Sequence, residues 1–413
     1  MDKNKMLVQS IEEHAVRIDA YDDLDTIVNA AANKRYVLLG EASHGTSEFY
    51  TMRAELSKRL IKDYGFSFIA VEGDWPSCFT VNQYIKGYSK ADAYTALKDF
   101  DRWPSWMWAN EEILELVKWL KTYNETAKSK TGFYGLDVYS LWESMEEIIR
   151  QLENISPADV ESAKQAFSCF EPFERRGENY AISSAYYGED CTEEVIKVLI
   201  DLQKKRKHYP KEQEGDLNLE VNSLVMLDAE RYYRAMARGG AEDWNIRDTH
   251  MVTALEKVMD AHGEDAKAII WEHNTHIGDA RATDMAEEGM VNVGQILREK
   301  YGEQVYAIGF GTHHGTVIAS DQWGGTVEVM DVPLAEAGSW EDALHQAGEF
   351  DKYILFNKKN EEAFSNVVGH RAIGVVYDPD LEHLGNYVPS RIAQRYDAFI
   401  FINQTSALIP LFK

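Results

Sequence analysis

Short apolar runs alternate with stretches of helical periodicity along most of the sequence, and this alternation constrains the fold more than any other feature. Several runs are uninterrupted and rich in Ile, Val and Phe, which is typical of parallel strands covered on both faces. The runs that we predict to be strands are residues 36–40, 66–72, 132–137, 266–273, 305–311, 352–357, 372–377 and 397–404.

The segment between the first two runs has the pattern of an amphipathic helix. Phe49, Met52, Leu56 and Leu60 fall on one stripe, and Gly65 follows as a stop signal. A strand, a helix and a second strand within about forty residues form a βαβ unit. We therefore predict an α/β fold with a mainly parallel sheet flanked by helices.

A long region without convincing strands interrupts this alternation. Residues 138–263 have the pattern of successive helices, and a polar break at residues 204–218 indicates a solvated connection between two of them. The region is too long for a crossover, so we predict a large inserted all-helical subdomain. The expected organisation is a first part of the α/β core at residues 1–137, a helical insertion at 138–263 that forms a lid or a cleft wall, and a second part of the core at 264–413.

The chain is strongly acidic. Its 413 residues include 69 Asp and Glu against 43 Lys and Arg, which gives a formal net charge of −26. This charge argues against nucleic acid or an anionic membrane surface as a partner, and it favours cationic ligands weakly. The start of the sequence has no apolar leader segment and no later stretch is long enough to span a membrane, so we expect a cytoplasmic protein.

The chain has three cysteines, Cys78, Cys169 and Cys191. Their number is odd, they are far apart, and their spacing matches no zinc-type pairing. We therefore expect inert buried thiols, with neither a disulfide framework nor a structural metal.

Polar side chains follow several predicted strands at the point where each strand ends. In an open parallel sheet the carboxyl ends of the strands border the crevice in which ligands bind. We therefore expect these side chains to lie close together. They are Glu41 and His44, Glu72 and Asp74, Asp137, Glu272, His273 and His276, and His313 and His314.

A histidine beside a carboxylate is suited to proton transfer, because the acid holds one ring nitrogen while the other takes a proton from water near neutral pH. Glu41 and His44 are three residues apart, as are His273 and His276, so each pair shares one face if its turn is helical. The same groups are also common metal ligands. The pattern thus predicts either a general base or a metal site.

Ser43 lies on the first strand-to-helix turn, which is the setting of a nucleophilic serine. The flanking residues are Glu-Ala-Ser-His-Gly and lack the first glycine of the Gly-x-Ser-x-Gly motif, so we favour His44 as a base over Ser43 as a nucleophile. Gly45 and Thr46 offer backbone N–H groups to an anion, but a phosphate loop has more glycines and a lysine.

Arg53 and a tryptophan-rich segment each have a structural and a functional interpretation. Arg53 is either a surface charge or a guanidinium that orients Glu41 or binds a developing oxyanion. Trp103, Trp106 and Trp108 either form an apolar wall for a bulky ligand or pack at the junction between domains.

Three blocks of sequence resemble the signature blocks of the erythromycin esterase family. They are LLGEASHGTSEFYTMRAELSKRLIKDYGFSFIAVEGDW, WEHNTHIGD and YAIGFGTHHGTVIA, in the order expected for that family and spread over most of the chain. The resemblance implies a mainly parallel α/β core with a helical insertion and hydrolysis of the lactone of macrolide antibiotics. It implies that His44 is the general base for water and that the same pocket is lined by Glu41, Arg53, Glu72, His273 and His276. It also implies that some members need no metal, and we expect no cofactor here; His313 and Asp137 receive no comparable role.

The mechanism expected from these residues is direct attack by water on an ester carbonyl. His44, oriented by Glu41, removes the proton, and His276 with Arg53 or His273 stabilises the oxyanion or protonates the leaving alcohol. Glu72 orients the water or pairs with a cationic group. The expected substrate is a small molecule, bulky and macrolide-like with an amine.

Other functions remain compatible with the pattern. A metal-dependent hydrolase or peptidase would use the same Glu and His cluster as ligands, a non-enzymatic protein would use the cleft to bind a small ligand or haem, and a related hydrolase would cleave an ester that is not an antibiotic.

Overall fold

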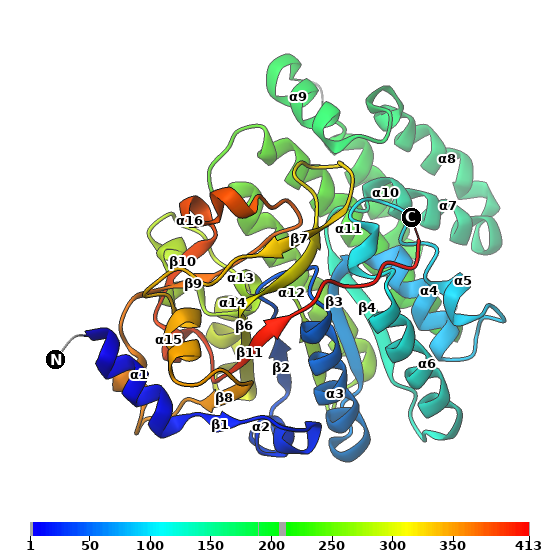
Figure 1. Cartoon of the computed structure of the whole chain (residues 1–413). Helices are drawn as coiled ribbons and strands as arrows, with labels where there is room; N and C mark the ends of the chain where they lie inside the picture. Colours follow the sequence, from blue (N-terminus) through cyan, green and yellow to red (C-terminus); the bar gives the residue numbers. More distant parts are fainter. Residues whose placement is uncertain (1–2, 189, 206–211, 413) are drawn as a thin grey trace.

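The computed structural model describes residues 3–188, 190–205 and 212–412, and within them a nine-stranded sheet forms the centre of the molecule (Figure 1). Its strands lie in the order β1-β8-β11-β6-β2-β5-β3-β4, and β7 pairs with β6 outside this order. The bounds are β1 Val16–Arg17, β2 Tyr36–Leu39, β3 Phe68–Asp74, β4 Gly132–Asp137, β5 Ala268–Trp271, β6 Val305–Ala319, β7 Glu328–Val332, β8 Lys352–Leu355 and β11 Ala398–Thr405.

Neighbouring strands from β11 to β4 are parallel. Only the margins are antiparallel: β8 runs against β11 and β1, and β7 runs against β6. A separate two-stranded antiparallel sheet consists of β9 (Val368–Arg371) and β10 (Tyr387–Ser390). The mainly parallel sheet is as predicted, because uninterrupted apolar runs can be buried on both faces.

Helices cover both faces of the sheet (Figure 1). Alternate strand residues point to opposite faces, so Val37 and Leu39 pack in one core while Tyr36 and Leu38 pack in the other. The first core is covered by α2 (Asp25–Ala31), α3 (Ser47–Tyr64) and α6 (Glu111–Thr126). The second is covered by α1 (Lys3–His14), α12 (Glu242–His262), α14 (Val293–Tyr301) and α15 (Trp340–Gln346).

Shorter helices complete this core. After β3, α4 (Trp75–Ile85) contributes side chains to both apolar clusters and is followed by α5 (Ala93–Ala96). The one-turn helix α13 (Asn274–Ile277) follows β5, and α16 (Glu382–Gly385) and α17 (Ile392–Arg395) lie on either side of β10 in the sequence. Helix α13 is short but decisive for the site, because it places His276 at the edge of the sheet.

Helix α3 follows the prediction closely. Phe49, Met52, Leu56 and Leu60 are buried on its inner face. Gly65 has a left-handed backbone with φ of 69°, and its N–H donates to the carbonyl oxygen of Ile61. Glycine adopts this conformation without steric cost, so it ends the helix where the apolar stripe ends.

The region between β4 and β5 consists of helices joined by short loops in its described residues, 138–188, 190–205 and 212–263, and none of these residues forms a strand. Its helices are α7 Leu141–Ile155, α8 Pro157–Phe167, α9 Gly177–Tyr187, α10 Thr192–Lys205, α11 Gly215–Met236 and α12 Glu242–His262. Many of their buried side chains, among them Leu152, Phe167 and Met226, form an apolar cluster of their own. The predicted all-helical insertion is therefore present; part of the predicted polar break at 204–218 lies outside the described residues.

Two cysteines correct the expectation of free thiols. Cys169 and Cys191 form a disulfide across 22 residues of sequence, with Cα atoms 5.9 Å apart. Helix α9 lies between them and folds back on α11, which brings the two positions together in space; linear spacing shows nothing of such a fold. Cys78 is a buried free thiol, as expected.

Two predicted strands differ from the structure. Strand β6 does not end at Gly311 but continues to Ala319, because its second half pairs with β7. Residues 372–377 form only isolated bridges instead of a strand. The N–H groups of Ile373 and Tyr377 donate to the carbonyl oxygens of Ala42 and Ser320, so these two side chains are buried without a strand ladder.

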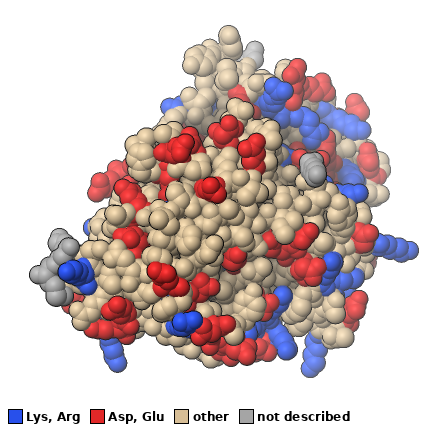
Figure 2. Space-filling view, viewed as in Figure 1, with Lys and Arg blue, Asp and Glu red and all other residues tan. Residues whose placement is uncertain are grey.

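The surface agrees with the acidic composition. Acidic side chains are spread over the face shown in Figure 2, with basic side chains between them, so on this face the charge is not gathered into a single patch. Among the described residues, no helix combines the length and the apolar character needed to cross a membrane.

Candidate active site

The carboxyl ends of β2, β3 and β5 meet at one edge of the sheet. Trp271 at the end of β5 is in register with Leu39 on one side and with Val71 on the other. Close packing joins the following loops: the Asn274 N–H donates to the carbonyl oxygen of Glu41 at 2.9 Å. An added Cβ at Gly40 would lie 2.1 Å from Asn274 Oδ1, so only glycine allows this approach.

A cleft opens at this edge. Its polar lining consists mainly of His44, Glu72, Asp74, Arg102, Ser105, Asp137 and Arg247, and its apolar lining includes Phe100, Trp103, Pro104, Met107, Trp108, Tyr139, Trp323 and Val375. Of the six predicted site residues, His44 and Glu72 line the cleft. The other four, Glu41, Arg53, His273 and His276, are buried around them.

Glu41 joins His44 to Arg53. His44 Nδ1 lies 3.0 Å from Glu41 Oε1, and Arg53 Nη2 donates to Glu41 Oε2 at 2.5 Å. The Arg53 guanidinium is fully buried between the rings of Tyr50 and Trp271, at 4.4 and 4.6 Å from their centroids. Arg53 thus orients Glu41 and has no surface facing the cleft.

This chain of contacts sets the proton positions on His44. Because the Glu41 carboxylate accepts at Nδ1, the neutral ring carries its proton there and leaves Nε2 as a base. Burial by itself lowers the pKa of His44, but the carboxylates of Glu72 and Glu41 outweigh it and raise the pKa above its ordinary value. His44 lines the cleft, so it is placed to take a proton from a bound molecule.

Glu72 connects the ends of β3 and β5. It accepts the His273 backbone N–H at Oε2 at 2.8 Å and the Arg247 Nη2–H at Oε1 at 2.7 Å. Burial raises its pKa, but His276 and His44, in their protonated forms, and Arg247 together lower the pKa below the ordinary value, so Glu72 is ionised.

His273 lies beside His44, with ring centroids 4.9 Å apart. Burial and the neighbouring His44 hold the pKa of His273 well below its ordinary value, so its ring is neutral. Its Nδ1 accepts the Thr275 backbone N–H at 3.3 Å, which places the ring proton on Nε2. That Nε2 is buried, and the ring also interacts with the backbone of Ala42.

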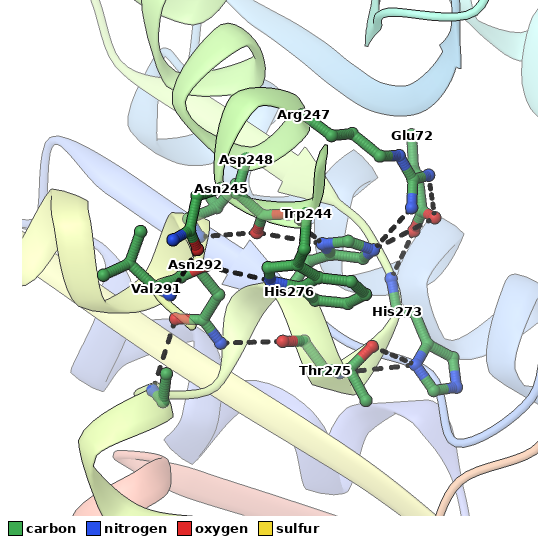
Figure 3. A network of polar contacts seen from close by, with 12 residues as sticks. Glu72, Trp244, Asn245, Arg247, Asp248, His273, Thr275, His276, Val291 and Asn292 are labelled. Carbon is green, nitrogen blue, oxygen red and sulfur yellow. Dashed lines mark hydrogen bonds and ion pairs between the residues drawn. The ribbon is translucent and has the colours of Figure 1, made fainter. Parts of the chain in front are cut away.

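His276 is enclosed by three residues of helix α12 (Figure 3). Its Nδ1 lies 3.0 Å from both oxygens of Asp248, and its ring stacks on Trp244 with centroids 4.6 Å apart. Arg247 Nη1 lies 3.0 Å from His276 Nε2. Since Asp248 accepts from Nδ1, His276 Nε2 accepts from Arg247 and is not free for a ligand.

Two further residues belong to the site. Sequence reasoning missed Arg247 and left Asp137 without a role. Arg247 Nε and Nη2 donate to the two oxygens of Asp137 at 2.9 and 2.7 Å. Arg247 therefore ties together the ends of β3 and β4 and the helical insertion. It lies 175 residues from Glu72 in sequence and follows no strand, so no local signal marks it, whereas Asp137 does end a predicted strand.

Glu272 lies next to this network without joining it. It is fully buried at the end of β5, and neither of its carboxyl oxygens has a hydrogen-bond partner among the described residues. Burial, with Glu72 and Asp248 nearby, raises the pKa of Glu272 well above its ordinary value, so the group is a neutral acid.

The tryptophans divide between wall and core. Trp103 lines the cleft and packs edge to face against Trp323, with ring centroids 4.7 Å apart. Trp106 is buried in the apolar core. Trp108 lines the cleft and donates from Nε1 to the Glu72 carbonyl oxygen at 2.9 Å. Trp103 and Trp108 thus face the cleft, and that they form a wall for a bulky ligand stays a prediction.

Several other candidates do not join the site. The Ser43 hydroxyl contacts the Thr46 hydroxyl instead of His44. Gly45 packs against the backbone of Ile318, so an added Cβ there would lie 2.0 Å from the Ile318 carbonyl oxygen. His313 and His314 lie within the extended β6, away from the residues that line the cleft.

Asp74 and the question of metal ligands complete the survey. Asp74 lines the cleft in an ion pair with Arg102, and burial raises its pKa. Within residues 3–188, 190–205 and 212–412, no group of three or more His, Cys, Asp or Glu side chains is arranged to hold a metal ion. The carboxylates of Glu41, Glu72 and Asp137 instead accept from arginine and histidine.

Comparisons with known proteins place the chain in a family. The sequence profile described as Erythromycin esterase matches residues 61–405, so the chain belongs to the erythromycin esterase family. Erythromycin esterase type II of Escherichia coli is 22% identical over 368 residues, covering 83% of this chain and 86% of that protein. Putative hydrolase YbfO of Bacillus subtilis is 24% identical over 377 residues, covering 86% of this chain and 82% of that protein.

Solved structures share the fold. A protein from Bacillus cereus matches with a TM-score of 0.82 and 18% identity over the whole of both chains. An erythromycin esterase mutant in its open conformation matches with a TM-score of 0.68 and 17% identity over 94% of each chain. The α/β core with its helical insertion is thus a known architecture.

Proposed function

We propose that the protein is a carboxylic ester hydrolase in which His44 activates water. The observation that carries this proposal is the buried chain Arg53–Glu41–His44, which ends in a free imidazole nitrogen at the wall of a cleft. A carboxylate behind an imidazole stabilises the imidazolium that forms when water loses its proton. Family membership and the hydrolase relatives support the same reaction class.

The reaction proceeds by direct attack of water. His44 Nε2 takes one proton from the water molecule, whose oxygen forms a bond to the ester carbonyl carbon while the carbonyl π pair moves onto oxygen. The tetrahedral oxyanion then collapses, the bond to the alkoxy oxygen breaks, and the imidazolium returns the proton to the leaving alcohol. The products are a carboxylic acid and an alcohol, and no acyl-enzyme forms because Ser43 has no base.

The proposed residues fall into two groups: those that contact the attacking water and those that position other residues. His44 touches the water and Glu72, which lines the cleft as an ionised carboxylate, orients it. Glu41 and Arg53 act through His44 as positioning residues, and His273 and His276 hold Glu72 and Arg247 in place through their contacts. Residues 138–263 supply one wall of the cleft through Tyr139 and Arg247.

The substrate class that we propose is a bulky, largely apolar ester, with a macrolide lactone as the first candidate. Trp103, Trp323 and Phe100 give the cleft an apolar wall, and aromatic faces also attract an amine. The name of the E. coli relative points to the same class. We propose a cytoplasmic location, where a small molecule that enters the cell meets the enzyme.

The experiment is a mass-spectrometric turnover assay with a panel of fourteen- to sixteen-membered macrolides and other bulky esters. A product heavier by one water, absent with His44→Ala and present with a chelator, supports the proposal. Turnover that a chelator abolishes favours the metal-dependent alternative. A covalent acyl adduct on Ser43 would contradict direct attack by water. Turnover of other esters but of no macrolide would exclude macrolides as the substrate.

A further inference from the structure

A water-activating esterase needs a hydrogen-bond donor for the carbonyl oxygen, and the donors expected from the sequence are not available. Arg53 is fully buried and bound to Glu41. His276 Nε2 already accepts from Arg247, and its Nδ1–H is held by Asp248. The His273 Nε2–H is buried, and His273 does not line the cleft.

Arg247 is the arginine of this network that reaches the cleft. It lines the cleft together with His44 and Glu72, and its side chain is 12% exposed. Three partners hold the guanidinium in place, namely Asp137, Glu72 and His276, and its plane lies over the Tyr139 ring at 4.8 Å. A donor held from so many sides loses little freedom when a ligand arrives.

Counting its N–H groups shows what Arg247 has left. A guanidinium carries five N–H donors. Nε donates one to Asp137, and Nη2 donates one to Asp137 and one to Glu72. Nη1 donates one to His276. One N–H remains, on Nη1, at a residue that faces the cleft.

We propose that Arg247 is a catalytic residue that donates this Nη1–H to the carbonyl oxygen of the ester, and that His276 is its positioning residue. The inference rests on the proposed function. During attack by water the carbonyl oxygen gains the electron pair of the π bond, and its contact with the guanidinium strengthens as that charge develops. His276 accepts the other Nη1–H and so sets the direction of the free one.

The helical insertion therefore completes the active site and does more than cover it. Trp244, Arg247 and Asp248 lie within little more than one turn of α12, and together they enclose His276 and reach Glu72 (Figure 3). The base, His44, follows a strand of the sheet, whereas the electrophilic group, Arg247, belongs to the insertion. Any displacement of α12 from the sheet edge separates the two.

The test measures steady-state kinetics of variants at Arg247 on the ester that the wild type hydrolyses. Arg247→Lys keeps the charge but cannot supply the forked donors. The double variant Arg247→Met with Asp137→Asn removes the cation together with one carboxylate, which avoids leaving both buried acids unpaired. The matched control is Lys257→Met, which removes another α12 cation whose partner, Glu220, is remote from the cleft.

We expect kcat to fall by about 100- to 1000-fold in both Arg247 variants, with KM changed by less than about threefold. Lys257→Met has wild-type kinetics. His276→Gln lowers kcat by about tenfold without moving the pH profile, because His276 donates no proton in this scheme. A wild-type kcat in either folded Arg247 variant overturns the proposal; if the double variant is unfolded by circular dichroism, Arg247→Lys decides. A comparable loss in His273→Gln with unchanged Arg247→Lys assigns the role to His273 instead.

A second measurement separates this inference from the proposed function. If the wild type hydrolyses no ester in the panel, the proposed function fails, and phenylboronic acid serves as the probe of the oxyanion position. Boron-11 NMR then reports whether bound boron is tetrahedral, as it is when hydroxide is added and its anionic oxygens are stabilised. A tetrahedral signal with the wild type that is lost in Arg247→Lys supports the inference; equal signals, or no binding to the wild type, overturn it.

Discussion

His44 and His313 are both buried histidines on parallel strands or directly after them, and their surroundings give them opposite properties. His44 has a carboxylate at Nδ1 and another nearby, and its pKa is raised. His313 stacks on His345 at 3.7 Å between ring centroids, and its Nδ1 lies 3.0 Å from that of His314. Burial and these neighbouring imidazoles lower the pKa of His313 to about 4.

The difference shows that a histidine near the edge of a sheet becomes a base through its partner. Burial alone disfavours the imidazolium, so an unpartnered buried histidine stays neutral and gains no affinity for a proton. A buried carboxylate reverses this balance. Arg53 supports the effect at His44, because its ion pair keeps Glu41 in place beside the ring.

The test with the largest expected effect removes each of the two imidazoles in turn. We expect His44→Ala to lower kcat/KM by about 1000- to 10,000-fold, because no other group at the cleft wall takes the proton from water. The matched variant His313→Ala changes kcat/KM by less than about twofold. Steady-state hydrolysis by both purified variants measures the contrast, and equal losses would show that the cleft is not where the reaction occurs.

The next test weakens the partner and keeps the base. Glu41→Gln removes a carboxylate that raises the pKa of His44, so the acid limb of the rate profile moves to lower pH. We expect kcat to fall by about 10- to 100-fold, since the imidazolium loses its stabilising charge. The pH profile of kcat/KM measures both effects. An acid limb that stays in place would mean that Glu41 only supports Arg53.

The pH dependence of the wild type sharpens the same contrast. Water activation needs neutral His44, so the rate falls about tenfold per pH unit as the pH drops below the raised pKa of His44. Histidine NMR should show one imidazole titrating above the ordinary value and in step with activity. The His313 resonance should not move until the pH approaches 4. A rate profile that follows the His313 resonance would reverse the assignment.

The smallest expected effect concerns stability. The unfolded chain protonates His313 near pH 6.5, whereas the folded chain resists protonation down to about pH 4, so this residue lowers the free energy of unfolding as the pH falls through that window. Between pH 7.5 and pH 4.5 we expect the free energy of unfolding of His313→Leu to fall by about 2 kcal/mol less than that of the wild type. Urea unfolding of both proteins at the two pH values measures this loss of stability. An equal loss in the two proteins would mean that folding does not hinder protonation of His313.

The sequence was sufficient for the fold class, the family and most of the residues that meet at the sheet edge. Uninterrupted apolar runs predict parallel strands, and parallel strands bring their carboxyl ends together, so Glu41, His44, Glu72 and His273 converge as predicted. The same reasoning wrongly ended β6 at Gly311 and so placed His313 at a strand end. It also predicted a strand at 372–377, where the chain binds to loops instead.

Local pattern determined what each strand end carries, because side-chain periodicity and turn residues depend on near neighbours in the chain. Tertiary structure alone decided the rest: that Arg53 is buried behind Glu41, that Cys169 meets Cys191, and that Arg247 from α12 reaches Glu72 and Asp137. These contacts join residues that are 12 to 175 positions apart. Removing the charged groups among them from water costs free energy, and charge pairing offsets that cost only once folding has brought the partners together.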